Sequence, residues 1–389
     1  MTLSENPRLF AIGIGLFAAI VTFSILMPLL LTDRDRLNGT HLIEYTHERS
    51  QAVYGLFSEL THNHNSARRQ FERTYAALSD DQVETLFQTH FPEHASGNRR
   101  GRDEDYDGSV SADGTLTYGM GSFLGLQPHD ARARRAVVSA FLTVRSAGPA
   151  HREQFDNFYF NDAHRLIMYG PEREDRLEFY RHTAPADLSF SEHPFVQIVS
   201  PAQNPLGQTV CTSLTDLIYA RDQRALTIGC HTPVRVNGLH VGAFGTTLPV
   251  HDYLATLVND PSGREALVIS REGRIVAHRA LFASDVITDQ DVASVAAELE
   301  LDELAQAITA NGRASGMIDD PVGSGVSAFA KLEAPGWYLV IREPAAAPPI
   351  GPVLLGTLIA LLAGLLAALQ VWSMRTKDND ETGEALAKA

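Results

Sequence analysis

The segment HTPVRVNGLHVGAFGTTLPVHDYL (231–254) decides the fold, because its pattern predicts two strands, a tight turn and a helix. Strand-like runs stand on both sides of Asn237-Gly238, a dipeptide that is a strong signal for a two-residue β-hairpin. After Pro249 the pattern becomes that of a short helix, HDYLATLV. The segment therefore predicts an antiparallel sheet followed by a helix.

Similar strand-like runs precede the hairpin from about residue 155. They are rich in β-branched and aromatic residues and are separated by Pro, Asn or Gly: NFYFN, RLIMYG, FVQIVSP, QTVCTSL and ALTIGCHTPVRV. Helical patterns come before them. A capping box of Ser79 and Gln82 opens one helix and residues 131–146 form another, whereas the Gly-, Arg- and Asp-rich residues 93–114 predict an exposed loop.

A longer helix is expected over 33–78. Its face carries a stripe that recurs at alternating steps of four and three residues, the spacing of helices that pack against each other. The stripe predicts a stalk that forms a parallel homodimer, with His64 as an interface residue and not a ligand. Its members are Val53, Phe57, Leu60, His64, Ala67, Phe71, Thr74 and Leu78.

The order of elements repeats downstream in shorter form. ALVISREGRIVAHRALF (266–282) predicts two strands around Glu272-Gly273, and the following helix, DVASVAAELELDELAQAITANG, ends at Gly312. GRASGMID, VSAFAKL and GWYLVIRE are the closing strands. This order of helices and strands predicts an α+β protein with two modules in series.

Two apolar stretches without charged residues flank the modules: LFAIGIGLFAAIVTFSILMPLLLT (9–32) and IGPVLLGTLIALLAGLLAALQVWS (350–373). Each is long enough to predict a transmembrane helix. The first exceeds the apolar core of a cleaved signal peptide and lacks an A-x-A site, which favours an anchor over a signal. Arg375 and Lys377 suit a cytoplasmic tail. Both termini are therefore expected in the cytoplasm and residues 33–348 outside.

Composition and motifs narrow the function classes. The formal net charge is −15 and no Lys/Arg block occurs, which argues against nucleic acid as a partner. No G-x-S-x-G, H-E-x-x-H or phosphate-binding glycine motif occurs, so we expect neither an enzyme nor a cofactor. DEDYDG (103–108) matches half of a calcium loop, but Gly114 stands where the bidentate glutamate belongs. A solvated acidic loop without metal is the prediction there.

The chain has two cysteines, Cys211 and Cys230, in runs that suit paired strands. An oxidising compartment would allow a cross-strand disulfide. A disulfide and a pair of buried thiols both fit the sequence.

Taken together, these segments resemble the double Cache (PAS-like) sensor domains of bacterial membrane receptors and sensor kinases. HTPVRVNGLHVGAFGTTLPVHDYL is similar to that family's hairpin ending in G-V-x-G-x-D and a helix, although Thr247 replaces the acidic residue. LVISREGRIVAHRALF (267–282) is similar to its V-I-D-x-x-G-x-I-x-A-H-P strand pair, and LEAPGWYLVIREP (332–344) to its final G-W-x-L strand. The resemblance covers most of residues 33–345.

The resemblance implies a ligand pocket between sheet and helices of the distal module. Amino-acid-binding members carry R-x-W-Y-x-x-A, and RLEFYRHTA (176–184) matches it only in part, since Arg176 is one residue out of register. An Arg and a Tyr still suit a carboxylate, whereas plain core packing of Phe179 and Tyr180 is the structural alternative. The ligand class (amino acid, organic acid or amine) stays open. The candidate ligand-binding residues are Tyr159, Arg176, Tyr180, Gln197 and Asp216.

We therefore expect an extracytoplasmic sensor of the bacterial inner membrane that binds a small ligand and signals to a kinase or another cytoplasmic partner. The alternative is an envelope protein-interaction module without a small-molecule ligand. The expected organisation is a cytoplasmic N-terminus (1–8), a transmembrane helix (9–32), the stalk helix (33–78), a membrane-distal module (79–250), a membrane-proximal module (251–345), a second transmembrane helix (350–373) and a cytoplasmic tail (374–389).

Overall fold

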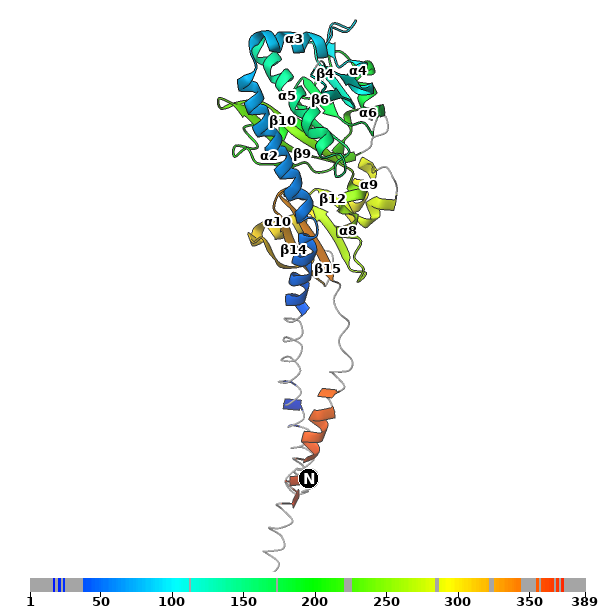
Figure 1. The fold of residues 1–389 in the computed structure, drawn as a ribbon. Coiled ribbons are helices and arrows are strands. Elements are labelled where there is room, and N and C mark those ends of the chain that lie inside the picture. The colour runs from blue at the N-terminus through cyan, green and yellow to red at the C-terminus, as the bar shows by residue number, and fades with distance from the viewer. Residues whose placement is uncertain are drawn as a thin grey trace, which may run out of the picture. The chain divides into compact units, whose positions relative to one another are not determined.

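A computed structural model gives the fold. It describes residues 38–343 except 112, 173, 220–225, 284–286 and 322–324, and a few residues within 17–24 and 355–373. The chain divides into two units, 43–342 and the two terminal parts taken together. The first of these units contains both of the sheets described below (Figure 1).

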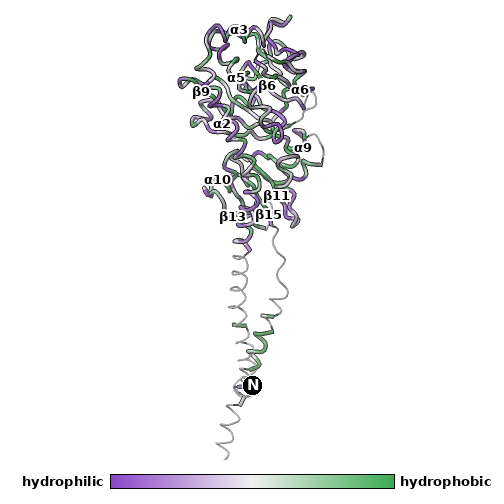
Figure 2. Tube along the Cα trace, viewed as in Figure 1, coloured by the Kyte–Doolittle hydropathy of each residue, from purple (hydrophilic) through white to green (hydrophobic). Residues whose placement is uncertain are grey.

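The predicted membrane spans, 9–32 and 350–373, lie mostly outside the described residues, as do 1–8 and the tail 374–389. Among the residues that are described, no helix combines the length and apolar composition needed to cross a membrane. The described helical residues between 355 and 366 are coloured hydrophobic in Figure 2. Both spans stay predictions.

The first sheet is antiparallel and has the strand order β1-β4-β6-β5-β10-β9-β7, with β8 paired to β9 off this path. Its centre is the long hairpin that the sequence predicts. The turn between β9 and β10 places Asn237 at φ 51° and Gly238 at φ 78°, which is the left-handed conformation that a two-residue hairpin turn requires. The strands are β1 (Arg99–Arg100), β4 (Met120–Leu124), β5 (Phe158–Asn161), β6 (Arg165–Tyr169), β7 (Val210–Cys211), β8 (Thr215–Asp216), β9 (Leu226–Val236) and β10 (Leu239–Leu248).

Helices cover one face of this sheet. α2 (Tyr54–Ala77) and α5 (Ala131–Ala150) lie side by side on it (Figure 1), and α3 (Asp80–His90) packs against α5. Phe71 of α2 stacks on Phe160 with ring centroids 5.7 Å apart. The predicted capping box of α3 is confirmed, since the Ser79 and Gln82 side chains each accept from the other residue's main chain.

The side chains of the stripe on α2 pack against other parts of the same chain. Phe57, Leu60, His64, Ala67 and Phe71 are all buried, and Ala67 and Phe71 join a core with the strands and α5. The stripe is therefore no support for a coiled-coil dimer, because its apolar side chains already contact the sheet. A homodimer through this helix stays a prediction without that argument.

The second sheet has the strand order β12-β11-β15-β14-β13 and is also antiparallel, as the described strand pairs show. The sequence predicted a single helix between the first two strands and the last three strands of this sheet. The structure has two helices there, because Glu300 adopts a left-handed φ of 47° between them. Gly312, at φ 68°, ends the second as predicted. The elements are β11 (Glu265–Ile269), β12 (Ile275–His278), β13 (Ser315–Asp319), β14 (Val326–Leu332), β15 (Trp337–Glu343), α8 (Val250–Val258), η3 (Arg279–Ala283), α9 (Asp289–Glu298) and α10 (Leu301–Asn311).

α2 contacts both sheets. Helical residues continue upstream of it to 38, but a turn at 52–53 interrupts the expected continuous stalk. Phe57 meets Trp337 of β15 edge-on, with ring centroids 5.6 Å apart. His64, seven residues further along the same face, contacts β9 and β10. α2 thus contacts β9 and β10 of the first sheet and β15 of the second.

The acidic loop is structured and partly buried, contrary to the prediction. α4 (Asp103–Asp107) and a hairpin of β2 (Ser109–Val110) and β3 (Leu116–Thr117) form within 93–117. Asp105 is only 1% exposed; its Oδ2 lies 2.9 Å from His90 Nδ1 and its Oδ1 accepts from Arg102 Nη2 at 2.7 Å. Burial alone would raise the pKa of Asp105, but these two partners hold it below its usual value. The Asp105 carboxylate is an internal ion-pair partner.

Candidate functional site

A pocket lies on the face of the first sheet opposite α2 and α5. Side chains alternate along each strand, so Phe158 and Phe160 of β5 face the helices whereas Tyr159 and Asn161 face the pocket. β6 behaves in the same way. The strands contribute Tyr159, Asn161, Leu166, Met168 and Thr247 to the pocket wall.

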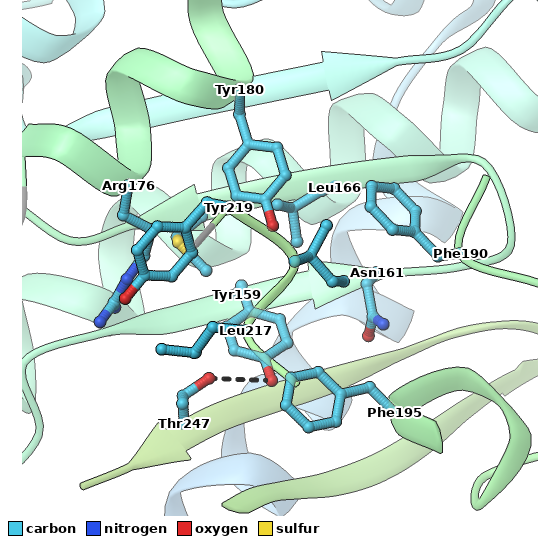
Figure 3. A pocket seen from close by; sticks show the side chains of 12 residues that line it. Tyr159, Asn161, Leu166, Arg176, Tyr180, Phe190, Phe195, Leu217, Tyr219 and Thr247 are labelled. Carbon is cyan, nitrogen blue, oxygen red and sulfur yellow. Dashed lines mark hydrogen bonds between the residues drawn. The ribbon is translucent and has the colours of Figure 1, made fainter. Parts of the chain in front are cut away.

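The other wall comes from α6 (Glu174–Glu178), the single π-helical turn η1 (Phe179–Thr183), and the segment from α7 (Pro194–Gln197) to β8. Arg176 and Tyr180 are four residues apart and therefore lie on one side of this helical stretch. Figure 3 shows Tyr180 pointing its hydroxyl toward Tyr159 and Leu217, with Arg176 beside Tyr219 and Asn161 at the opposite end. The remaining lining residues are Phe190, Phe195, Leu217, Ile218 and Tyr219.

Arg176 is the charged residue of the described lining. Its side chain is 4% exposed, and Nη2 lies 3.6 Å from Asp156 Oδ2, a carboxylate outside the lining. The guanidinium carbon is 5.4 Å from the centre of the Tyr219 ring. Nε and Nη1 are buried and have no hydrogen-bond partner among the described residues. Buried polar groups are normally hydrogen-bonded, so these two donors are suited to an anionic partner.

Tyr159 forms the base of the pocket together with polar groups of the sheet. Its hydroxyl lies 2.8 Å from His231 Nε2 and accepts from Thr247 Oγ1 at 3.4 Å. Burial raises the pKa of Tyr159 and lowers the pKa of His231 to about 3. Tyr159 is therefore protonated and His231 neutral at neutral pH.

Gly245 of β10 lets the Tyr159 ring lie flat on the sheet. A Cβ at this position would stand 2.4 Å from Tyr159 Cε2 and 2.7 Å from His231 Cδ2. Any other residue would push both rings away. The glycine of the GAFG motif therefore shapes the pocket floor.

The pocket has little free space in this conformation. Its volume is about 30 Å³. Since one water requires roughly 10–15 Å³ by such a measure, it holds a few water molecules at most. A ligand of amino-acid size requires the lining to move apart.

The opposite face of the same strands holds α2 through a buried histidine. His64 Nδ1 lies 3.1 Å from Thr232 Oγ1, and Nε2 lies 2.9 Å from Thr246 Oγ1. Burial lowers the pKa of His64 to about 3. Thr232 follows His231 and Thr246 precedes Thr247 in the sequence. Neighbouring residues on β9 and β10 therefore contact the pocket on one face and α2 on the other.

Cys211 and Cys230 form a disulfide between β7 and β9, where they are direct cross-strand partners with Cα atoms 4.0 Å apart. β7 has two residues and lies at the sheet edge. The bond fixes the edge strand just before the segment that carries Leu217, Ile218 and Tyr219.

The structure brings together three of the five candidate ligand-binding residues, namely Tyr159, Arg176 and Tyr180. Gln197 and Asp216 are not among the lining residues. The Gln197 amide donates to the main-chain oxygen of Ser191, and Asp216 is exposed in β8.

Asn161, Thr247 and Tyr219 line the pocket but were not predicted. The strand alternation points to Asn161, which is two residues from Tyr159. No sequence signal marks Thr247 or Tyr219, because their place depends on how separate segments pack.

A second, wider cavity of about 610 Å³ lies beside α9, α10 and the β11–β12 turn. Its described lining includes Arg274 and the acidic residues Asp289, Glu300, Asp302 and Glu303. None of these residues has a buried polar atom without a partner. In the described part of the chain, no cluster of His, Cys, Asp and Glu suits a metal ion.

Comparison with known proteins gives structural neighbours only. A scan against protein-family models finds no match, and a search of the curated proteins finds none. Among solved structures, the chain is similar to the periplasmic sensory domain of the Campylobacter jejuni chemoreceptor Tlp1 (13% identity, TM-score 0.43, covering 80% of this chain and 96% of that one).

Two further neighbours come from Pseudomonas. The chain is similar to the ligand-binding domain of the P. aeruginosa amino acid chemoreceptor PctB, in complex with L-Arg (16% identity, TM-score 0.32, covering 51% and 74%). It is also similar to the ligand-binding domain of the P. fluorescens chemoreceptor CtaA, in complex with L-serine (15%, 0.35, covering 54% and 79%). These neighbours are sensor domains of bacterial chemoreceptors, the kind of domain that the sequence resembles.

Proposed function

We propose that the chain is a membrane-anchored extracytoplasmic sensor that binds a small carboxylate in the pocket between the first sheet and α6–η1. Arg176 is the observation that carries this proposal. It is buried, and two of its guanidinium nitrogens have no hydrogen-bond partner among the described residues. A carboxylate satisfies such donors with charge-assisted hydrogen bonds, often two in parallel.

The signal would pass through the sheet to α2. Because the pocket has little free space, a ligand must displace lining side chains, among them Tyr159. Tyr159 is hydrogen-bonded to His231, and the adjacent Thr232 contacts His64 of α2. A ligand that binds an open pocket better than a closed one shifts the balance between two packings of these strands against α2.

The second sheet would receive the change through the same helix. Phe57 and His64 are seven residues apart, two helical turns, and so lie on one face of α2. Phe57 contacts Trp337 at the start of β15. β15 is the last strand before the predicted second span, so its displacement is a route to a cytoplasmic kinase or other output.

Binding is tested by thermal unfolding of the full chain, purified in detergent, with a panel of organic acids, amino acids and amines. A ligand at 100 times its Kd should stabilise the fold by about 2.7 kcal/mol. Arg176→Gln should abolish this shift. The control is Arg152→Gln, which removes an exposed arginine paired with Glu172 outside the pocket.

Stabilisation that survives Arg176→Gln would contradict the assigned site. No stabilisation across the panel, together with a co-purifying membrane protein, would favour the interaction-module alternative. Turnover of a bound compound would contradict the expectation that the chain is not an enzyme.

A further inference from the structure

We propose, on the basis of the function proposed above, that the pocket selects monocarboxylates with an uncharged, largely apolar body and discriminates against α-amino acids. The described lining contains one cation, Arg176, and no carboxylate. The carboxylate of a ligand can pair with this cation, whereas the ammonium of a zwitterion finds no carboxylate in the described lining.

The place where an α-ammonium would lie in the pocket also matters. An α-ammonium is attached to the carbon next to the carboxylate, so it would lie close to the Arg176 guanidinium. Asp156 is the carboxylate paired with Arg176, but it stands outside the described lining and is 30% exposed. An α-ammonium in the pocket would be buried close to the Arg176 guanidinium, which is a like charge, and no carboxylate of the described lining would pair with it, which is unfavourable.

The described side chains that are hydrogen-bonded to Tyr159 also carry no negative charge. The partners of its hydroxyl are His231 and Thr247, which are neutral. Arg176 is the charged group that acts on the pKa of Tyr159. The pKa of His231 is lowered first by burial and then by the nearby His64 and His193. Among the residues that the structure describes, the base of the pocket therefore offers no anionic partner for an ammonium.

The middle of the pocket is suited to an apolar body. Leu166, Leu217, Ile218 and the rings of Tyr180 and Phe190 surround it. Asn161 stands at the end opposite Arg176 (Figure 3), and its Oδ1 is buried with no donor among the described residues. A neutral hydroxyl or amide on the far end of the ligand would satisfy this amide.

The experiment compares ligands that differ only in the ammonium group. Isothermal titration of the full chain in detergent would use 3-phenylpropanoate against phenylalanine, and 4-methylpentanoate against leucine. Butanoate against 4-aminobutanoate tests an ammonium far from the carboxylate, and 2-phenylethylamine tests an ammonium alone. We expect each acid to bind at least tenfold more tightly than its amino acid.

Equal or tighter binding of the amino acids, or tight binding of 4-aminobutanoate or the amine, would overturn this inference and leave the sensor function standing. Failure of all acids, amino acids and amines to bind would overturn the sensor function itself. The two failures are therefore distinguishable.

An isosteric variant provides a second test. Asn161→Asp introduces a carboxylate into the lining with almost no change in size. It should weaken butanoate at least tenfold and improve 4-aminobutanoate relative to butanoate. Asn311→Asp, at an exposed position at the end of α10, is the matched control and should change neither affinity. An unchanged ratio in Asn161→Asp would contradict the inference.

Discussion

His64 of α2 and His231 of β9 are both fully buried, and their side chains lie on opposite faces of the first sheet. Each imidazole is hydrogen-bonded to one or two hydroxyl groups of the protein in place of water. Neither has a carboxylate partner to stabilise a positive charge, so burial holds both neutral. Their neutrality makes the fold sensitive to acid.

Stability should fall as pH drops below about 6.5. Both histidines have a pKa of about 3 when folded, against an unfolded value of 6.5. Their contribution is therefore complete above pH 6.5, and it is lost as pH falls from 6.5 toward 3, because the unfolded chain binds the proton first. Each histidine should contribute a slope of about 1.4 kcal/mol per pH unit in this window. Chemical denaturation between pH 5 and 7.5 measures it.

His64→Gln should remove one histidine's share of that slope. His62→Gln is the control, because His62 lies two residues away on the same helix and is exposed. Equal slopes in the wild type and His64→Gln would contradict the burial of an uncharged His64.

Residue chemistry was predictable where it followed a local pattern. Arg176 and Tyr180 were proposed from the partial match of residues 176–184 to R-x-W-Y-x-x-A, and Tyr159 as a residue of the expected sheet; all three line the pocket. Gln197 and Asp216 were also proposed, but neither is among the lining residues, because the Gln197 amide donates to the main chain and Asp216 faces solvent. Their side-chain directions depend on irregular segments, whose geometry has no sequence period.

At the scale of elements, β7 is held to β9 by both strand pairing and the disulfide. It has two residues and pairs only with β9. Cys211 and Cys230 are 19 residues apart, and closing a loop of this length stabilises a fold by about 3 kcal/mol in the chain-entropy account.

Removal of the disulfide should cost roughly that amount. The Cys211→Ala/Cys230→Ala variant is predicted to unfold about 3 kcal/mol more easily in chemical denaturation. A reductant should destabilise the wild type similarly and leave the double variant unchanged. A loss below about 1 kcal/mol would show that the strand holds without its cross-link.

Elements with local signals were predicted well. The β9–β10 hairpin, the α3 capping box and the β11–β12 pair are confirmed. The sequence pattern of α2 correctly predicted that one face of the helix is buried, but not what buries it. A second helix in a dimer and a sheet of the same chain would both bury such a stripe. The break between α9 and α10 was missed because Glu300, a good helix former, takes a left-handed conformation there.

At the scale of the whole molecule, α2 connects the two sheets. It contacts β9 and β10 through His64 and β15 through Phe57. The sequence predicted two α+β modules in series, and the structure has two antiparallel sheets in that order. The sequence did not predict that α2 contacts both sheets, because Phe57 and Trp337 are 280 positions apart in the chain.

Trp337 should report ligand binding from a distance. The chain has two tryptophans, Trp337 and Trp372. In a Trp372→Phe background, the fluorescence of Trp337 should change when a ligand fills the pocket, because α2 shifts Phe57 against its ring. A variant that also carries Phe57→Leu should bind with similar affinity but show a smaller change.

An unchanged spectrum at saturating ligand in the Trp372→Phe background would contradict coupling through α2. Tyr54→Leu is the matched control, since Tyr54 is exposed on the same helix and should leave the response intact.

The small free volume of the pocket has a kinetic consequence. A cavity of about 30 Å³ admits a ligand only during excursions to a wider form, so the observed association rate should level off at the opening rate as concentration rises. Once the walls close again, escape needs the same rare excursion. The protein would then bind and release its ligand slowly, and its occupancy would average brief fluctuations in ligand concentration.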